Sequence, residues 1–155
     1  MLNYGKVYVA GVELNSYWQY RITRQYILRL NGNVTYQKAV DRTDPKSKTY
    51  NHQIPYTPLW SGSVSLSLQT PWITVTYSML GCSDRYSLSQ NIPANLVKGY
   101  TDHSITLGHD FNFSKSTLCL KLELLNLSNQ NYEIIRNYPM QGFGLRFKAV
   151  YDLNF

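Results

Sequence analysis

The chain has 155 residues, enough for one domain, and its 43% hydrophobic content is too high for a disordered protein. Charged residues make up only 15%, whereas soluble proteins usually contain about a quarter. The 15 Lys and Arg outnumber the 9 Asp and Glu but are scattered along the chain, which argues against nucleic-acid binding.

Targeting and cysteine signals are sparse. No apolar run approaches the ~20 residues of a membrane helix. The first residues, MLNYGKVYVAG, lack a basic region followed by the apolar stretch of a secretory signal. We therefore expect either a protein that stays inside the cell or the downstream piece of a longer chain. Cys82 and Cys119 belong to no CxxC or Cys/His cluster, so we expect two free thiols.

The first two predicted elements are strands at residues 5–18 and 25–40, with apolar side chains at every second position. In the first, Val12 and Leu14 flank the polar Glu13. The second has the same period of two. Neither shows the 3.6-residue period of a helix.

The middle of the chain repeats the pattern in four predicted strands. They cover residues 61–70, 72–81, 100–113 and 116–127. GSVSLSLQ and ITVTYSML, within the first two, place large apolar residues on one face and Ser or Thr on the other. In the third, His109 interrupts the apolar row.

The last predicted strand, residues 142–155, reads GFGLRFKAVYDLNF. Its large apolar residues alternate with a face that carries Arg146 and Lys148. At ~3.3 Å per residue and a tilt near ~40°, the row from Phe143 to Phe155 rises roughly 30 Å, which matches the hydrocarbon layer of a membrane. Soluble strands usually stop at about five or six residues.

The connections between the strands alternate in length. Short ones near residues 20–24, 70–71 and 114–116 alternate with long ones at 41–60, 82–99 and 128–141. In an antiparallel meander, this places all short turns at one end and all long loops at the other, as in transmembrane β-barrels. We predict an all-β fold, an antiparallel up-and-down meander of about seven long strands that is part of a transmembrane β-barrel.

Alternation alone leaves the direction of the two faces open, because soluble barrels also alternate. Here the polar face is rich in Ser, Thr, Asn, Gly and Gln, which suits a hydrated lumen. Aromatic residues gather near the strand ends, as two membrane-interface girdles require. We assign to these girdles Trp18, Tyr36, Trp72, Tyr77, Tyr100, Phe111, Phe113 and Tyr151. We assign to the lumen the charged residues Arg29, Lys121, Glu123, Arg146 and Lys148.

Two neighbouring acid and histidine pairs, Asp102 with His103 and His109 with Asp110, could suggest catalysis. Adjacent residues on a strand point to opposite faces, so neither pair converges on one substrate. We therefore predict that the protein is no enzyme and has no metal site and no cofactor.

The segment NLSNQNYEIIRNYPMQGF, residues 126–143, resembles the C-terminal pattern of TonB-dependent outer-membrane receptors. The matching positions are Asn126, Leu127, Asn129, Tyr132, Tyr138, Pro139 and Gly142. Gln141 and Phe143 depart from it, where the family more often has Pro and Arg. The segments GVEL at 11–14 and IPYTP at 54–58 also resemble parts of that barrel. The C-terminal Phe155 resembles the assembly signal of bacterial outer-membrane proteins.

This resemblance implies a barrel of about 22 strands around an N-terminal plug. Such a receptor takes up iron chelates, cobalamin or other scarce solutes across the Gram-negative outer membrane, with energy passed on through TonB. Residues 1–155 would be its C-terminal barrel segment, without the plug. The implied partners are outer-membrane lipid, the remaining strands, the plug, TonB through that plug, and the barrel-assembly machinery.

Seven strands would leave two unpaired edges in lipid, so we expect a fragment that neither transports nor inserts stably alone. Two other functions stay open: a small structural or adhesive outer-membrane barrel of eight strands, and a soluble β-barrel that binds an apolar ligand. The charges assigned to the lumen could hold the plug through ion pairs or could be ordinary solvated charges.

Overall fold

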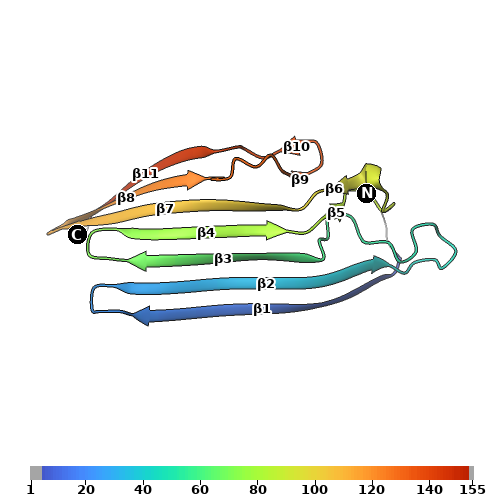
Figure 1. Ribbon diagram of the computed structural model, residues 1–155, viewed down its shortest axis with the longest axis horizontal. Helices are drawn as coiled ribbons and strands as arrows, with labels where there is room; N and C mark the ends of the chain where they lie inside the picture. Colours follow the sequence, from blue (N-terminus) through green and yellow to red (C-terminus); the bar gives the residue numbers. More distant parts are fainter. Residues whose placement is uncertain (1–4, 154–155) are drawn as a thin grey trace.

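The computed structural model describes residues 5–153, and seven long strands form one antiparallel sheet (Figure 1). These strands are β1 (Val7–Arg21), β2 (Ile27–Asp41), β3 (Trp60–Gln69), β4 (Thr74–Cys82), β7 (Tyr100–Phe113), β8 (Ser116–Leu125) and β11 (Gly144–Leu153). Each pairs with the next long strand along the chain. The predicted up-and-down meander is confirmed.

Short elements that the sequence did not predict lie inside the long loops. They are β5 (Arg85–Tyr86), the 3-10 helix η1 (Pro93–Asn95), β6 (Leu96–Val97), β9 (Glu133–Ile135) and β10 (Tyr138–Pro139). Elements of two or three residues are too short to show a period. No helix in residues 5–153 is long and apolar enough to cross a membrane.

Several strand ends differ from the prediction by a few residues. The first hairpin continues to the pair Arg21 and Ile27 before it turns. Strand β4 begins only at Thr74, because the hydroxyl and amide of Thr70 both donate to the carbonyl of Ile73 and close the turn there. Strand β8 ends before Asn126, whose φ of 47° leaves the extended region.

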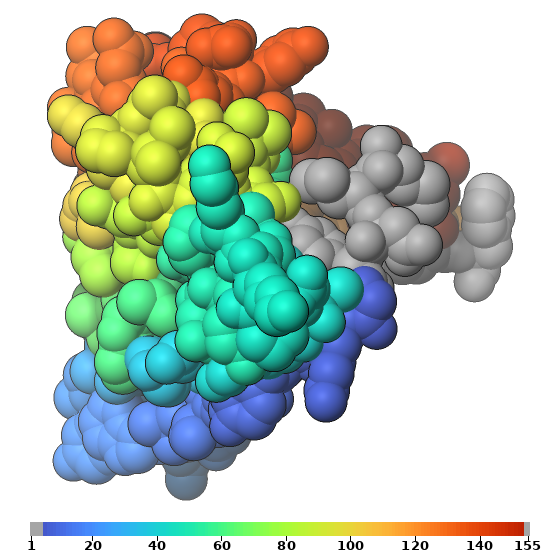
Figure 2. All heavy atoms as spheres, turned by 90° about the vertical axis from the view of Figure 1, so that its right-hand side faces the viewer, coloured from blue at the N-terminus to red at the C-terminus, as the bar shows by residue number. Residues whose placement is uncertain are grey.

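The two ends of the sheet are unlike, as the connection lengths predicted. The short turns lie at one end, and the three long loops lie at the other (Figure 1). The loops, in cyan, yellow-green and orange, lie side by side there (Figure 2). We call these the turn end and the loop end.

The register of the sheet gives it one apolar face. Leu28 lies opposite Leu68, and the row continues through β4, β7 and β8 to Phe147. The members of this row are Leu28, Leu68, Val75, Leu107, Leu122 and Phe147. Because side chains of a strand alternate, the neighbouring positions form a second face. We call the two the apolar face and the polar face.

The apolar face is uncovered. Leu145 and Phe147 on β11 are 65% and 67% exposed, and Leu14 on β1 is 66% exposed. The buried apolar side chains of the described residues are Ala39, Val40, Val97 and Tyr132, all towards the loop end. Within residues 5–153 the sheet therefore has no second layer over its apolar face, and that face needs an apolar surrounding.

Candidate functional site

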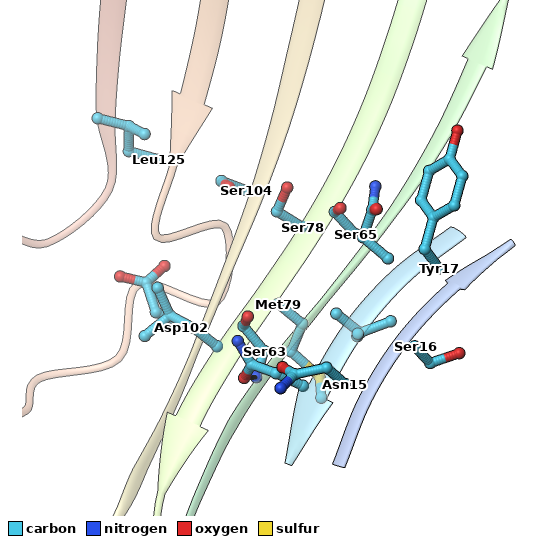
Figure 3. Close-up of a pocket in the computed structure, with 15 residues that line it drawn as sticks. Asn15, Ser16, Tyr17, Ser63, Ser65, Ser78, Met79, Asp102, Ser104 and Leu125 are labelled. Atoms are coloured by element: carbon cyan, nitrogen blue, oxygen red, sulfur yellow. Dashed lines mark hydrogen bonds between the residues drawn. The ribbon is translucent and has the colours of Figure 1, made fainter. Parts of the chain in front are cut away.

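The centre of the polar face is hollowed and lined by small polar side chains (Figure 3). A row of Asn31, Ser65, Ser78 and Ser104 crosses β2, β3, β4 and β7 in register. It lines a hollow of ≈ 570 Å³ together with residues of β1. Hydroxyl and amide groups of this size keep a surface hydrated without filling it.

Charge is scarce in this central hollow. Among the described residues that line it, Asp102 alone is charged, and its carboxylate accepts a hydrogen bond from Tyr132 Oη at 2.6 Å. Tyr17, also in the lining, donates to Gln19 at 2.8 Å. The described lining of this hollow thus carries one charge and combines hydroxyl and amide groups with the apolar side chains of Val64, Met79, Leu80 and Leu125.

Towards the turn end, the polar face carries the five charged residues assigned to the lumen, and the register places all of them on it. Arg29 begins a cross-strand row that passes Ser67, Thr76 and Thr106 and ends in Glu123 and Arg146. Arg29 donates to Gln19 at 3.1 Å and to Gln69 at 2.9 Å. Glu123 and Arg146 form an ion pair.

Lys121 and Lys148 lie directly opposite each other in the next row. Like charges at such positions repel each other. The pair Glu123 and Arg146 lies in the neighbouring row of the same face, so the two lysines have the Glu123 carboxylate on that side. The β8 and β11 side of the polar face therefore presents more cationic than anionic groups in these two rows.

Most of the predicted girdle aromatics lie on the apolar face. The register places there Trp18, Tyr36, Phe111, Phe113 and Tyr151. Trp72 is 69% exposed in its turn and contacts Tyr26 edge to face, with ring centroids 6.3 Å apart. Their placement at the two membrane interfaces stays a prediction.

Two of the predicted girdle aromatics are placed differently. Tyr100 is on the polar face, opposite Cys82, and its ring stacks on Tyr132 at 4.1 Å. The sequence prediction failed because it considered the distance of Tyr100 from the strand end but not its parity in β7. Tyr77 is on the apolar face but in the middle of β4, where its hydroxyl is 2.6 Å from His103 Nδ1. Phe155, the predicted assembly signal, lies outside the described residues.

At the loop end, the long loops form a packed cluster around Arg85. Arg85 is 3% exposed, and its guanidinium donates to the carbonyls of Lys98, Glu133 and Ile134, the last two at 2.6 and 2.9 Å. It also lies over the ring of Tyr100 at 5.6 Å. Arg85 therefore binds the loop before β7 to the loop before β11.

Tyr132 strengthens the same contact from the other loop. Its side chain is 9% exposed, stacked on Tyr100 and bonded to Asp102. Burial, followed by the hydrogen bond to the Asp102 carboxylate, raises the pKa of Tyr132 well above its ordinary value. The phenol therefore stays protonated as a donor.

The loop between β2 and β3 is joined to the cluster through backbone and amide groups. Gln53 N donates to Asn91 Oδ1 at 2.6 Å, and Asn91 Nδ2 donates back to Gln53 O at 3.2 Å. Tyr56 N donates to Tyr86 O at 2.8 Å. The three loops therefore hold one another in place.

The sequence did not single out Arg85 as a functional residue. It lies in a loop with no periodic pattern, and its partners are carbonyl oxygens 13 to 49 positions away. Asn126, Asn129 and Tyr132 were noticed only as parts of a family pattern. No local signal identifies which loop residue will be buried by another loop.

The remaining predictions about chemistry concern cysteines, acids and histidines. Cys82 and Cys119 are free thiols, as predicted. Asp102 and His103 point to opposite faces of β7, as do His109 and Asp110. Among residues 5–153, no group of three or more metal-ligating side chains comes together.

The chain is similar to known proteins over most of its length. A family model described as TonB dependent receptor-like, beta-barrel, matches residues 1–129. The ferric yersiniabactin uptake receptor FyuA from Yersinia pestis has a similar structure, with a TM-score of 0.62 and 17% identity. The similarity covers 96% of this chain but 23% of that receptor. No curated protein matches the chain.

Proposed function

Because the chain belongs to the TonB-dependent receptor β-barrel family, we propose that it forms the C-terminal wall segment of an outer-membrane transporter for a scarce solute. Membership of this family places it in the outer membrane of a Gram-negative bacterium. The chain spans about a quarter of the length of the receptor FyuA. Uptake, as of an iron chelate or cobalamin, belongs to the whole transporter.

The observation that carries this proposal is the two-faced sheet with all long loops at one end. The exposed apolar face fits lipid, and the hydroxyl-lined polar face fits a wet lumen. The loop end fits the external side, where transmembrane barrels carry their longer loops. A soluble barrel would bury the face that is open here.

The two edges of the sheet indicate how many additional strands a closed barrel requires. Strands β1 and β11 each have one partner, and both run from the loop end to the turn end. A closed antiparallel barrel therefore requires an odd number of additional strands, because the two edges are parallel to each other. A receptor of about 22 strands meets this condition, and so does a barrel of about eight. The family match favours the receptor over the small barrel.

The partners of the polar face follow from its charges. We propose that Arg29, Lys121, Arg146 and Lys148, with Glu123, face the plug and help to hold it, while TonB acts through that plug. The opposed pair Lys121 and Lys148 supports this role, since an anionic partner would relieve their repulsion. Outer-membrane lipid and the barrel-assembly machinery are the partners proposed for the apolar face and the C-terminus.

A charge reversal tests the proposed contact with the plug. Arg146→Glu in the intact receptor would break the ion pair with Glu123 and place two carboxylates side by side. We expect uptake of the receptor's solute to fall several-fold, with normal amounts of receptor in the outer membrane. Unchanged uptake would mean that these are ordinary solvated charges.

The proposed transport is tested by uptake in a receptor-deletion strain. We expect growth at limiting iron or limiting cobalamin to require the intact receptor gene and a functional TonB. Complementation that is equally good without TonB would contradict the proposal. The alternative small barrel predicts no growth phenotype under either limitation.

A further inference from the structure

A separate hollow lies on the apolar face towards the loop end, where β3 pairs with β4. Its volume is ≈ 400 Å³, within the range of roughly 300–1,000 Å³ of small-molecule sites. The strand residues of the apolar face that line it are Val34, Trp60, Gly62, Val64, Met79, Gly81 and Thr101. The hollow therefore opens towards the side that we assign to lipid.

Two glycines form the floor of this hollow. Gly62 and Gly81 lie directly opposite each other on β3 and β4, so the backbone there has no side chain over it on this face. A Cβ at Gly62 would lie 2.6 Å from Asn33 O, and one at Gly81 would lie 2.6 Å from Tyr100 O. The close pairing of the strands therefore keeps this part of the apolar face bare.

Apolar and aromatic side chains form the two ends of the hollow. Towards the turn end, Val64 and Met79 lie directly opposite each other. Towards the loop end, the ring of Trp60 is 53% exposed and contacts the ring of Tyr36, with centroids 4.7 Å apart. An apolar depression bounded by an indole ring suits a hydrocarbon chain, which gains contact area on all sides.

One cation lies on the apolar face just beyond the aromatic pair. Lys38 is exposed, lies opposite Ala10, and is two positions from Tyr36 towards the loop end. A lysine on the lipid face of a barrel is costly at the middle of the bilayer and nearly free of cost at its edge. The ammonium of Lys38 therefore belongs at the level of the lipid headgroups, with its methylene groups along the apolar surface.

No acid of the described residues neutralises Lys38. The apolar-face positions of β1 and β2 hold no carboxylate, and the ion pair found in residues 5–153 joins other groups. Asp41 belongs to the polar face, where it accepts from Thr43 N at 2.8 Å and from Thr49 Oγ1 at 3.0 Å. An anionic group from outside the described residues would therefore complement Lys38.

The hollow and Lys38 lie within reach of a single lipid molecule. Val34, at the edge of the hollow, and Lys38 are on the same face of β2, about 13 Å apart at ~3.3 Å per residue. The order along the strand is apolar hollow, aromatic pair and cation. A lipid in a bilayer has the matching order of acyl chain, interface and charged headgroup.

We propose that this part of the apolar face holds one lipid of the outer leaflet, with an acyl chain in the hollow and a phosphate on Lys38. The lipid class is a phosphorylated glycolipid of the lipid A type, because such lipids make up the outer leaflet of the Gram-negative outer membrane. The inference rests on the proposed function in one respect, the assignment of the loop end to the external side.

The test uses the purified intact receptor in detergent, stripped of lipid and titrated with lipid A, and native mass spectrometry measures the bound lipid. Val64→Phe fills the hollow. Its matched control is Leu66→Phe, because Leu66 lies on the same face of β3 but outside the lining. Lys38→Gln removes the charge, and its control is Lys115→Gln, an exposed lysine in the turn between β7 and β8.

We expect one lipid A molecule to bind the wild-type receptor saturably. Val64→Phe should weaken this binding about tenfold and Lys38→Gln about fivefold, and both controls should stay within about twofold. Equal binding by all variants would overturn the proposal. Lys38→Gln changes an exposed side chain, so it tests the site even where Val64→Phe fails to fold.

Two further probes test the chemistry of the lipid. Phosphatidylglycerol that binds as tightly as lipid A would overturn the choice of a glycolipid, and lipid A without its phosphates that binds equally well would overturn the role of Lys38. Growth assays with and without TonB measure transport separately. A receptor that supports TonB-dependent uptake but binds no lipid A would therefore overturn this site and leave the proposed function intact.

Discussion

At the scale of single residues, Asn126 determines where the last long loop begins. Its Nδ2 donates to Gln130 O and Gln141 O, both at 3.0 Å, and its Oδ1 accepts from Gln130 N at 3.0 Å. The residue is 2% exposed and has a φ of 47°, a conformation that Asn tolerates better than most residues. One amide therefore stops β8 and closes the base of the loop.

Replacement of this amide should loosen the loop. Asn126→Ala removes these three hydrogen bonds and a longer one from Ser128 Oγ, and forces Ala into the left-handed region, which we expect to cost about 3 kcal/mol. Limited proteolysis of the intact receptor should then cleave the loop before β11 faster than in wild type. Asn112→Ala, at an exposed position of β7, is the control and should leave the cleavage rate unchanged. Equal cleavage in both variants would contradict the role of Asn126.

Tyr132 makes the same loop sensitive to alkaline pH. Its pKa is raised above the ordinary 10.0 by burial and by the Asp102 carboxylate, so folding favours the protonated phenol. This contribution is complete below about pH 10 and is lost as the pH rises through the folded pKa, because only the unfolded phenol has released its proton. Amide hydrogen exchange in the loop should therefore accelerate above about pH 10, beyond the intrinsic rate increase. Tyr132→Phe should remove this additional acceleration, and an unchanged pH profile in that variant would show that another group is responsible.

At the scale of elements, the pairing of β4 with β7 depends on close backbone contact. A Cβ added at Gly81 would lie 2.6 Å from the carbonyl oxygen of Tyr100, closer than real Cβ atoms come. A Cβ at Gly108, on the neighbouring strand, would meet nothing nearer than 3.7 Å. The close pairing of β4 with β7 thus requires a glycine at position 81, whereas position 108 has room for a Cβ.

We expect Gly81→Ala to destabilise the wall at the loop end by about 1–3 kcal/mol, because the backbone of β7 must shift. The matched variant Gly108→Ala should be nearly neutral. The urea midpoint of unfolding, followed by loss of heat-modifiable mobility of the intact receptor, measures both. Equal midpoints for the two variants would show that the strands adjust without cost.

At the scale of the whole molecule, the sheet is an open piece of wall. The edges of β1 and β11 leave backbone groups without strand partners among the described residues, and each such group costs several kcal/mol in hydrocarbon. In water, none of the residues that the structure describes would cover the apolar face. Neither lipid nor water alone therefore suits the seven strands.

We therefore predict that residues 1–155 expressed alone, with a secretory signal supplied, will not insert stably into the outer membrane. The readouts are heat-modifiable migration and protease resistance of the membrane fraction, with the intact receptor as the positive control. A heat-modifiable, protease-resistant species of the isolated segment would overturn this prediction. A segment that folds as a monomer in plain buffer would overturn the assignment of its apolar face to lipid.

The sequence by itself determined the strands, their order and their two faces. Period-2 alternation is a local property, because every second side chain of a strand shares a face. A segment such as ITVTYSML therefore specifies both a strand and its two faces. The alternation of short and long connections specified the loop end in the same way. The period-2 alternation also placed Arg29, Glu123 and Arg146 on one face, since their parity within the strands is readable from the chain.

Only the tertiary structure decided how the three long loops pack against one another at the loop end. The burial of Arg85, the stack of Tyr100 on Tyr132 and the strained Tyr56 arise from contacts between loops that are distant in the sequence. Loop residues follow no period, so nothing local records which of them meet. The face expected for Tyr100 was wrong because its distance from the strand end was considered and its parity in β7 was not. Tyr77 lies in the middle of β4 rather than near its end, because strand ends become certain only when the partner residues are known.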